Sequence, residues 1–244
     1  MLTGNTEDPA ASIVHAQALL PDLGSPESFA EARGWMDKCL ANHPECPKNV
    51  PVDLPTRLVE VSRFGEPEAA RLVETSGQKG HYCALSYCWG GDQVFKTLRE
   101  RYDQYKEALP CHDLPQTIKD AFHVARGMGV WYIWIDAFCI IQDSDEDKEV
   151  EMAKMMSIYQ NTQFTISAGS ASAVAEGFLQ TDYHDPNIGA FYHPLRVDEH
   201  TMGSVIITES ASSFASVGAL QQPINTRAWT LQEALLTPRL LMFY

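Results

Sequence analysis

Two short stretches of the sequence combine residue types that could bind or cleave a small molecule. The first, Ser-Tyr-Cys-Trp-Gly-Gly, contains a hydroxyl in Ser86, an aromatic plane in Trp89 and backbone amides made accessible by Gly90. Together these groups could hold a nucleotide-like ligand. The second has Asp136 directly after an apolar run, where its carboxylate either faces a cleft or caps the next segment. The alternative for the first stretch is that Trp89 belongs to the core and Gly90 only turns the chain.

An acidic run follows, with six acidic residues among positions 143–151. A calcium loop is excluded because Lys148 stands where such a loop needs glycine and Lys154 where it needs a bidentate glutamate. Most of these acids are better explained as favourable charge near the N-terminus of a helix, on a solvated face. Glu151 lies a turn further along, where it could point back toward the sheet edge. There it could stabilise positive charge during glycosidic cleavage or orient a ribose hydroxyl.

The cysteines give weaker signals. Cys39, His43 and Cys46 have a spacing that could suit zinc, but a closed structural zinc site needs four ligands and no nearby pair supplies the rest. We therefore predict no metal site and interpret these cysteines as buried, small apolar side chains. Cys139 lies between two bulky apolar residues, which favours an inert buried thiol over a reactive one.

Composition limits the classes of function. The 244 residues are 45% apolar and 20% charged, which is typical of a globular protein with a sizeable core. The net charge of −14 disfavours nucleic acid and anionic membranes as partners. No stretch is long and apolar enough to span a bilayer, and the N-terminus lacks the features of a secretory signal. We therefore expect a cytoplasmic protein.

The elements that must position the candidate residues alternate between helix and strand. Apolar residues at steps of three and four predict a helix over 114–128. A second helix is expected over 146–159, with apolar positions at Val150, Met152, Met155, Met156 and Tyr159. Further helices are expected over 26–40 and 228–236. Strands are predicted over 57–63, 70–75, 82–87, 130–136, 163–168, 205–208 and 239–244, whereas 170–200 is expected to be a long loop or insertion.

This order predicts an α/β fold in which a mainly parallel sheet is flanked by helices, with extra strands and loops. We expect residues 1–34 to form an N-terminal extension and residues 35–244 to form the main domain. The apolar ending of the chain suggests a piece of a longer protein.

Three blocks of the sequence resemble the heterokaryon-incompatibility (HET) domain of filamentous fungi. They are Tyr82–Gly90, Trp134–Tyr159 and Arg227–Phe243, in the family's order. Shorter agreements are Trp35 with Cys39, His43 and Cys46, the run Leu-Pro-Thr-Arg-Leu at 54–58, and Leu-Pro-Gln-Thr at 114–117. The resemblance covers about residues 35–243.

The resemblance implies a domain that triggers programmed cell death when genetically unlike cells fuse, acting with a receptor or allelic partner protein. It also implies a flavodoxin-like fold distantly similar to Toll/interleukin-1 receptor (TIR) domains, with self-association as the mode of activation. Some TIR domains hydrolyse NAD through a glutamate on a helix that follows a central strand. By that likeness NAD is the candidate substrate and the chain a candidate NAD nucleosidase.

The same likeness assigns roles to individual residues. Glu151 and Asp136 are the predicted catalytic acids, with Glu233 as the alternative functional acid. The predicted contacts to the nucleotide are Ser86, Trp89, Gly90 and Cys139.

Overall fold

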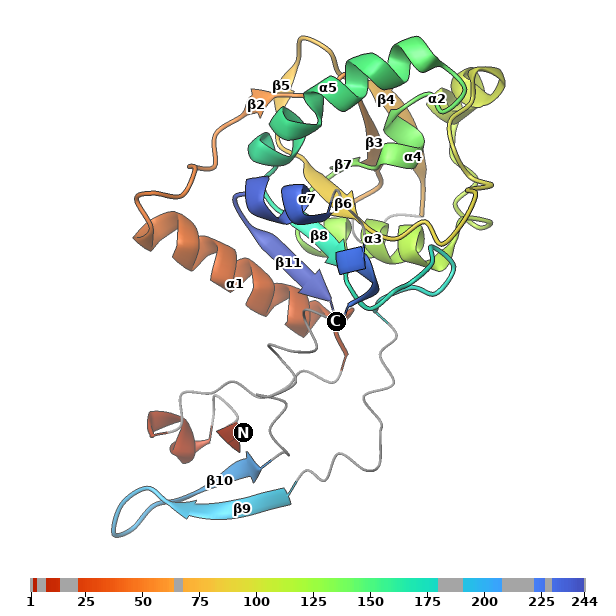
Figure 1. Ribbon diagram of the computed structural model, residues 1–244. Helices are drawn as coiled ribbons and strands as arrows, with labels where there is room; N and C mark the ends of the chain where they lie inside the picture. Colours follow the sequence, from red (N-terminus) through yellow and green to blue (C-terminus); the bar gives the residue numbers. More distant parts are fainter. Residues whose placement is uncertain are drawn as a thin grey trace. The chain divides into compact units, whose positions relative to one another are not determined.

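The computed structural model divides into two compact units, which are described separately (Figure 1). Residues 2–3, 8–13, 22–63, 68–179, 191–207, 222–226 and 230–243 are described. The larger unit contains residues 24–179 and 222–244, and the smaller one contains residues 1–23 and 180–221. Among the described ranges, no helix has the length and apolar character needed to cross a membrane.

The larger unit alternates helices and strands, as the sequence predicts. Its helices are α1 (Pro26–Asn42), η2 (Arg99–Arg101), α2 (Tyr102–Glu107), α3 (Gln116–Gly127), α4 (Asp136–Cys139), α5 (Asp145–Asn161), η3 (Pro223–Thr226) and α7 (Thr230–Leu236). Its strands are β2 (Val52–Asp53), β3 (Arg57–Val61), β4 (Ala70–Glu74), β5 (Lys79–Gly80), β6 (Cys83–Ser86), β7 (Tyr132–Trp134), β8 (Thr165–Ala168) and β11 (Leu240–Phe243).

Six of these strands form one sheet in the order β11-β8-β6-β7-β3-β4. The first four are parallel to one another, whereas β3 runs antiparallel to both β7 and β4. The prediction of a mainly parallel α/β sheet is therefore confirmed. Strands β7 and β8 lie on opposite sides of β6. The connection from β6 to β7, which contains α3, and the connection from β7 to β8, which contains α5, therefore run in opposite directions across the sheet. In open sheets this divergence creates a crevice beyond the carboxyl ends of the strands.

Local sequence signals explain where the long helices begin and end. Ser25 caps α1, since its hydroxyl accepts from the backbone N–H of Ser28, and Pro26 follows at the first helical position. Ser144 caps α5 in the same way, ahead of three acidic residues that favour a helix N-terminus. After α3 the chain turns at Gly129, whose φ of 76° suits glycine.

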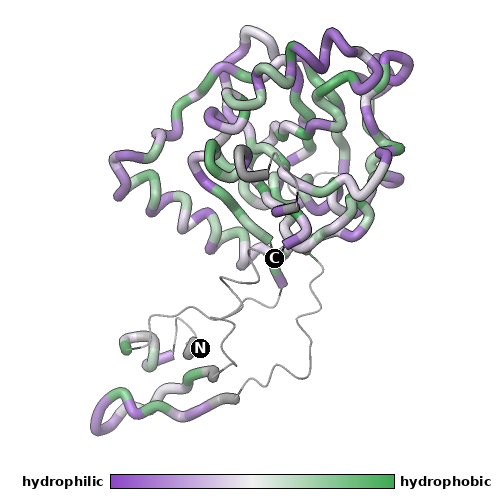
Figure 2. Tube along the Cα trace, viewed as in Figure 1, coloured by the Kyte–Doolittle hydropathy of each residue, from purple (hydrophilic) through white to green (hydrophobic). Residues whose placement is uncertain are grey.

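The sheet is covered on both faces. On one face the ring of Trp134 packs edge-on against Tyr159 of α5, with 5.8 Å between ring centroids. Ser86, which points to this same face, meets Glu233 of α7. Helix α3 packs against β3, β7 and β8 and presents its predicted apolar face to the core, and α1 packs on α3. Figure 2 shows the resulting alternation of hydrophobic and hydrophilic stretches along the chain.

The smaller unit contains β1 (Leu2–Thr3), η1 (Pro9–Ser12), β9 (Phe191–Arg196) and β10 (Met202–Ile207) in an antiparallel sheet of order β1-β10-β9. Asp8 links η1 to this sheet, because its carboxylate accepts from the backbone N–H of Ala10 and of Ser204. Residues 170–200 were expected to be a long loop or an insertion; residues 180–200 belong to the smaller unit, and residues 191–196 form β9. The predicted strand at 205–208 begins earlier, at Met202.

Candidate functional site

Two groups of polar side chains lie near the carboxyl ends of the parallel strands. We name Ser86, Trp89, Asp136 and Glu233 the strand-edge cluster. Thr56, Arg57, Asp147, Glu151 and Lys154 are named the Arg57 network.

In the strand-edge cluster, Trp89 and Asp136 meet directly. The indole Nε1 of Trp89 donates to Asp136 Oδ2 at 3.0 Å, and both residues are half-buried. Asp136 is the first residue of α4 and not the end of a strand as predicted. Its Oδ1 accepts from the backbone N–H of Ala137 at 2.7 Å, so the carboxylate binds the N-terminus of α4 as well as the indole. A carboxylate and an aromatic ring, both partly exposed, thus lie beyond the carboxyl ends of β6 and β7, which is where open parallel sheets bind ligands.

The other two residues of the cluster, Ser86 and Glu233, are buried and bind each other. The hydroxyl of Ser86, at the end of β6, donates to Glu233 Oε2 of α7. Ser86 is 2% exposed and Glu233 is 4% exposed. The first and third blocks of the sequence are therefore joined by a buried hydrogen bond to a carboxylate, which is among the stronger kinds.

Gly90 is explained by a close approach of two backbone segments. Its φ is 73°, and a Cβ at this position would lie 2.3 Å from the Cβ of Ala173. A side chain would therefore both strain the backbone and collide with the residues 172–173. Gly90 turns the chain, which was the alternative to ligand binding, although its exposed backbone still lies next to Trp89.

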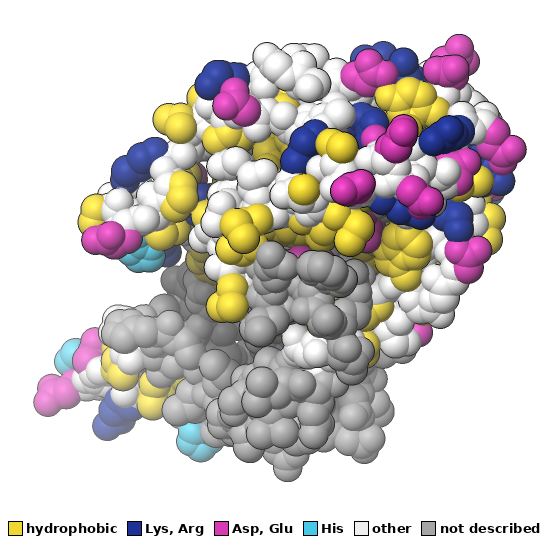
Figure 3. Space-filling model, turned by 45° about the horizontal axis from the view of Figure 1, so that its top comes forward, with side chains coloured by type: hydrophobic (Ala, Val, Ile, Leu, Met, Phe, Trp, Pro, Cys, Tyr) yellow, Lys and Arg dark blue, Asp and Glu magenta, His cyan; other side chains and the backbone are white. Residues whose placement is uncertain are grey.

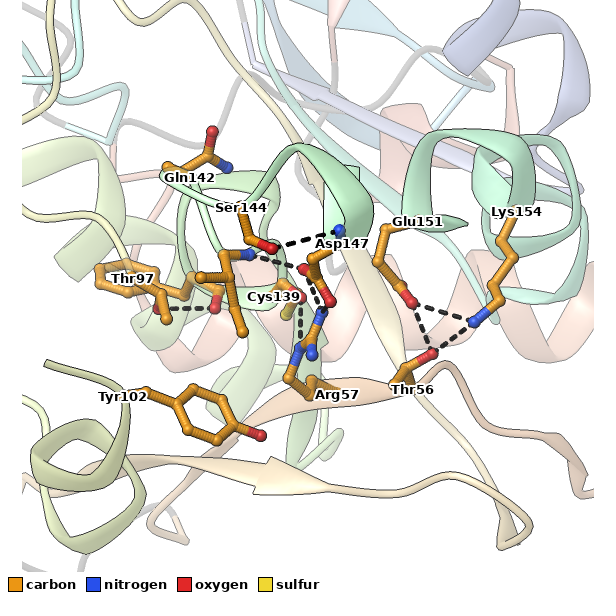
Figure 4. A network of polar contacts seen from close by, with 12 residues as sticks. Thr56, Arg57, Thr97, Tyr102, Cys139, Gln142, Ser144, Asp147, Glu151 and Lys154 are labelled. Atoms are coloured by element: carbon orange, nitrogen blue, oxygen red, sulfur yellow. Dashed lines mark hydrogen bonds and ion pairs between the residues drawn. The ribbon is translucent and has the colours of Figure 1, made fainter. Parts of the chain in front are cut away.

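The Arg57 network lies where the first turns of α5 face the start of β3 (Figure 4). Arg57 is 5% exposed, and its guanidinium binds both oxygens of Asp147 at 2.6 and 2.7 Å. Burial alone would lower the pKa of Arg57, but the hydrogen bond and charge of Asp147, together with Glu151 and Tyr102, raise it overall, so the guanidinium keeps its charge. Asp147 also accepts from the backbone N–H of Ile141. Most of the acids were expected on a solvated face, and Asp143, Asp145, Glu146 and Glu149 are exposed, whereas Asp147 is half-buried.

Glu151 points toward the sheet edge and is 1% exposed. Its Oε1 accepts from Thr56 Oγ1 at 2.7 Å and from Lys154 Nζ at 3.0 Å. Its Oε2 is buried and has no hydrogen-bond partner within the part of the chain that the structure describes. An acceptor left without a donor in the interior is unfavourable by about 1–3 kcal/mol, so this oxygen is a place where a hydroxyl or water would be bound favourably.

Cys139 belongs to the interior. Its side chain is fully buried, and burial raises the pKa of its thiol to about 12. Its backbone carbonyl accepts from Arg57 Nε at 2.7 Å. The residue therefore positions Arg57 through its backbone, and its thiol has no surface through which to contact a ligand.

The connection between α4 and α5 is fixed by contacts that the sequence analysis did not anticipate. Thr97 donates through its hydroxyl to the carbonyl of Phe138, and Gln142 donates to the carbonyl of Asp136. The guanidinium of Arg99 binds the capping hydroxyl of Ser144. Thr56 and Arg57 were likewise missed as site residues. The signal was the short run at 54–58, which was noted for the resemblance alone.

Two cavities are found elsewhere on the larger unit. One of about 390 Å³ is lined by Glu60, Arg71 and Trp131 among others, and one of about 200 Å³ by Trp35, Cys39 and Arg239 among others. Neither is lined by the strand-edge cluster or by the Arg57 network.

Residues 82–233 match a family model described as heterokaryon incompatibility protein (HET). The chain belongs to this family. No curated protein and no solved structure matches it. Membership implies that this HET protein has a role in heterokaryon incompatibility. The matched range contains the whole strand-edge cluster, whereas Thr56 and Arg57 of the Arg57 network precede it.

Proposed function

We propose that this HET protein is a cell-death effector of heterokaryon incompatibility that acts in the cytoplasm, signals by self-association and is engaged by a receptor or allelic partner protein. The observation that carries the proposal is the closed state of both candidate glutamates. Glu151 and Glu233 are 1% and 4% exposed, and each is hydrogen-bonded within the chain. An acid held in this way does not reach a substrate, so the single chain is suited to signalling through its surface.

The surface for self-association is proposed on α5 and the adjoining α7. Met152 and Met156 are 47% and 51% exposed and lie four residues apart, so they share one face of α5. Val150, another apolar position of this helix, is 51% exposed. Leu235 of α7, which packs beside α5, is 73% exposed. Figure 3 shows hydrophobic side chains interspersed with charged ones on the face that it brings forward. Such a mixed surface fits a second copy of the chain better than a membrane.

The test compares two sets of methionines. Met152→Lys combined with Met156→Lys should abolish both cell death on overexpression and concentration-dependent assembly, because each lysine would have to be buried on contact. Met202→Lys is the matched control, since Met202 is 54% exposed in the smaller unit. Viability of expressing fungal cells and light scattering of the purified chain are the readouts. Full toxicity of the double variant would refute the proposal.

Hydrolysis of NAD is the second candidate. It is supported by the unpartnered, buried Oε2 of Glu151 and by the half-buried Trp89 and Asp136 beyond the carboxyl ends of β6 and β7. In this proposal Trp89 and the backbone of Gly90 hold the nucleotide, and Asp136 and Glu151 flank its ribose. The hydroxyl of Ser86, which was also expected to contact the nucleotide, is instead buried against Glu233. Self-association would have to expose the buried carboxylate of Glu151 to the substrate. NAD turnover would then depend on clustering of the chain.

NAD consumption by the purified chain, clustered on a support, separates the two candidates. If the chain is a hydrolase, Glu151→Gln and Asp136→Asn should each lower turnover at least about 100-fold while the circular dichroism spectrum stays unchanged. Equal background consumption by wild type and both variants, with toxicity retained, would exclude hydrolysis and leave the signalling proposal intact.

A further inference from the structure

The C-terminal end of α1 brings together three side chains that have the chemistry of metal ligands. The ligand atoms of Cys39, His43 and Cys46 all lie within 4.8 Å of one another. The cysteines are half-buried and His43 is exposed. The expectation that these cysteines are buried apolar side chains was therefore wrong.

The backbone explains how a short segment produces this cluster. Cys39 lies in the last turn of α1, and His43 caps the helix with extended dihedral angles, φ −106° and ψ 101°. The chain then turns back, because the backbone N–H of Cys46 donates to the carbonyl of His43 at 3.3 Å. The turn places Cys46 Sγ 3.9 Å from His43 Nδ1. In a tetrahedral zinc site, with Zn–S bonds of about 2.3 Å, ligand atoms are about 3.5–4 Å apart. Small side-chain rotations therefore suffice to reach that geometry.

We propose that Cys39, His43 and Cys46 bind one Zn²⁺ ion, with the fourth position taken by water. Two soft thiolates and an imidazole suit zinc, whereas magnesium and calcium prefer oxygen ligands. The two thiolate charges balance the charge of the ion, so a half-buried site gains no net charge. Three ligands from the chain do not close the coordination shell, and the exposure of His43 gives water access to the remaining position.

Arg239 completes the surroundings of the site. Its Nε lies 3.4 Å from Cys39 Sγ, where it can donate to the thiolate while the thiolate binds the metal. The same guanidinium donates to the carbonyls of Pro47 at 2.7 Å and Gln163 at 3.2 Å. Arg239 directly precedes β11, so the metal site would join the end of α1 and the following loop to the edge of the sheet.

A pair of neighbouring cysteines could instead form a disulfide, and the two states differ in mass and metal content. The test uses the whole chain, purified with a reductant, stripped with a chelator and reloaded with zinc. Zinc content is measured by mass spectrometry, and Co²⁺ is used as a spectroscopic probe of thiolate coordination. Wild type should retain one zinc per chain and show thiolate-to-cobalt absorption. Chelation should lower the melting temperature by several degrees, because the metal binds only the folded state.

The variants isolate each ligand. Cys46→Ser and His43→Gln should each weaken zinc binding at least about 100-fold, and Arg239→Gln about 10-fold. Cys111→Ser is the matched control, since Cys111 is also half-buried but lies outside the cluster, and it should bind as wild type does. Cys46 lies in a loop, so Cys46→Ser should stay folded, as circular dichroism would verify. Loss of two hydrogens in place of metal uptake, or an unchanged cobalt spectrum in Cys46→Ser, would overturn the proposal.

Discussion

The Arg57 network and the strand-edge cluster both lie beside the carboxyl ends of the parallel strands, but their charged groups have different kinds of partner. In the first, a buried guanidinium and a carboxylate compensate each other, and most of the surrounding polar atoms are hydrogen-bonded (Figure 4). In the second, a buried glutamate meets a neutral serine hydroxyl, while the carboxylate of Asp136 stays half-buried against the indole of Trp89. The first arrangement suits fixing a loop, and the second leaves groups accessible to a ligand.

The contrast suggests a division of roles between the two groups. Breaking the Arg57 network should impair folding, whereas the exposed half of the strand-edge cluster should tolerate change and alter function. The single oxygen that does not fit this division is Oε2 of Glu151, a buried acceptor inside the otherwise satisfied network.

Arg57→Met should have the largest effect on stability. It leaves the half-buried carboxylate of Asp147 without its buried partner and removes the donor to the carbonyl of Cys139, which should lower the free energy of unfolding by about 3–5 kcal/mol. The control is Arg71→Met, whose side chain is 55% exposed in its pair with Glu60 and which should lose less than about 1 kcal/mol. Urea unfolding gives both values. Equal losses would mean that burial of the pair makes no difference.

Ser86→Ala should come next. A buried carboxylate loses a hydroxyl donor, so the free energy of unfolding should fall by about 1.5–3 kcal/mol. Ser157→Ala removes an exposed hydroxyl of α5 and should change stability by less than about 0.5 kcal/mol. If both variants unfold at the same urea concentration as wild type, the Ser86–Glu233 hydrogen bond makes no measurable contribution to the free energy of unfolding.

Alkaline pH should destabilise the protein through Cys139. The unfolded chain releases the thiol proton near the ordinary pKa of 9.0, whereas the folded chain retains it until about pH 12. The unfolded state therefore binds fewer protons between these values, and stability falls as pH rises by up to about 1.4 kcal/mol per pH unit. Unfolding measured from pH 8 to 11 should show a shallower decline for Cys139→Ala than for wild type. Parallel curves would contradict the assignment to this thiol.

Glu151→Gln should have the smallest effect, within about 1 kcal/mol. Glutamine keeps an oxygen to accept from Thr56, and removing a buried charge offsets the loss of the pair with Lys154, which is 43% exposed. Thermal unfolding is a sufficient measurement. A loss above about 2 kcal/mol would show that the charge of Glu151 is needed for folding, and would remove the variant as a clean probe of hydrolysis.

The sequence predicted those parts of the fold that depend on local patterns. The apolar steps in α3 place Ile118, Ala121 and Phe122 in the core, as observed. Strand β9 was missed because Pro194 interrupts the sequence pattern of a strand. The segment is a strand because it pairs with β10, and its own sequence does not indicate this. Of the apolar positions named for α5, Tyr159 is buried, whereas Val150, Met152 and Met156 are exposed.

From the sequence, individual residues of the candidate site could be predicted, but the contacts between them could not. The type and position of Asp136 suggested capping or a cleft; its carboxylate accepts from the next backbone N–H, but the N-cap position of α4 is Ile135. Ser86 and Glu233, in contrast, are 147 positions apart, and no local pattern reveals that they meet. The same applies to Arg57 and Asp147, which are 90 positions apart. Residues 54–58 are placed against α5 by tertiary packing. The periodicity of apolar residues in the sequence carries no information about such a contact.

The position of β11 at the end of the sheet has a consequence for synthesis on the ribosome. Strand β8 is complete at Ala168, but its parallel partner β11 is not made until Phe243, after residues 180–221 of the smaller unit. Glu233, the partner of Ser86, also emerges late. At about 5–20 residues per second, β8 has an unpaired edge for several seconds while the chain grows. A nascent chain in this state is exposed to aggregation and to chaperones, and it gains its complete sheet only when the last strand arrives.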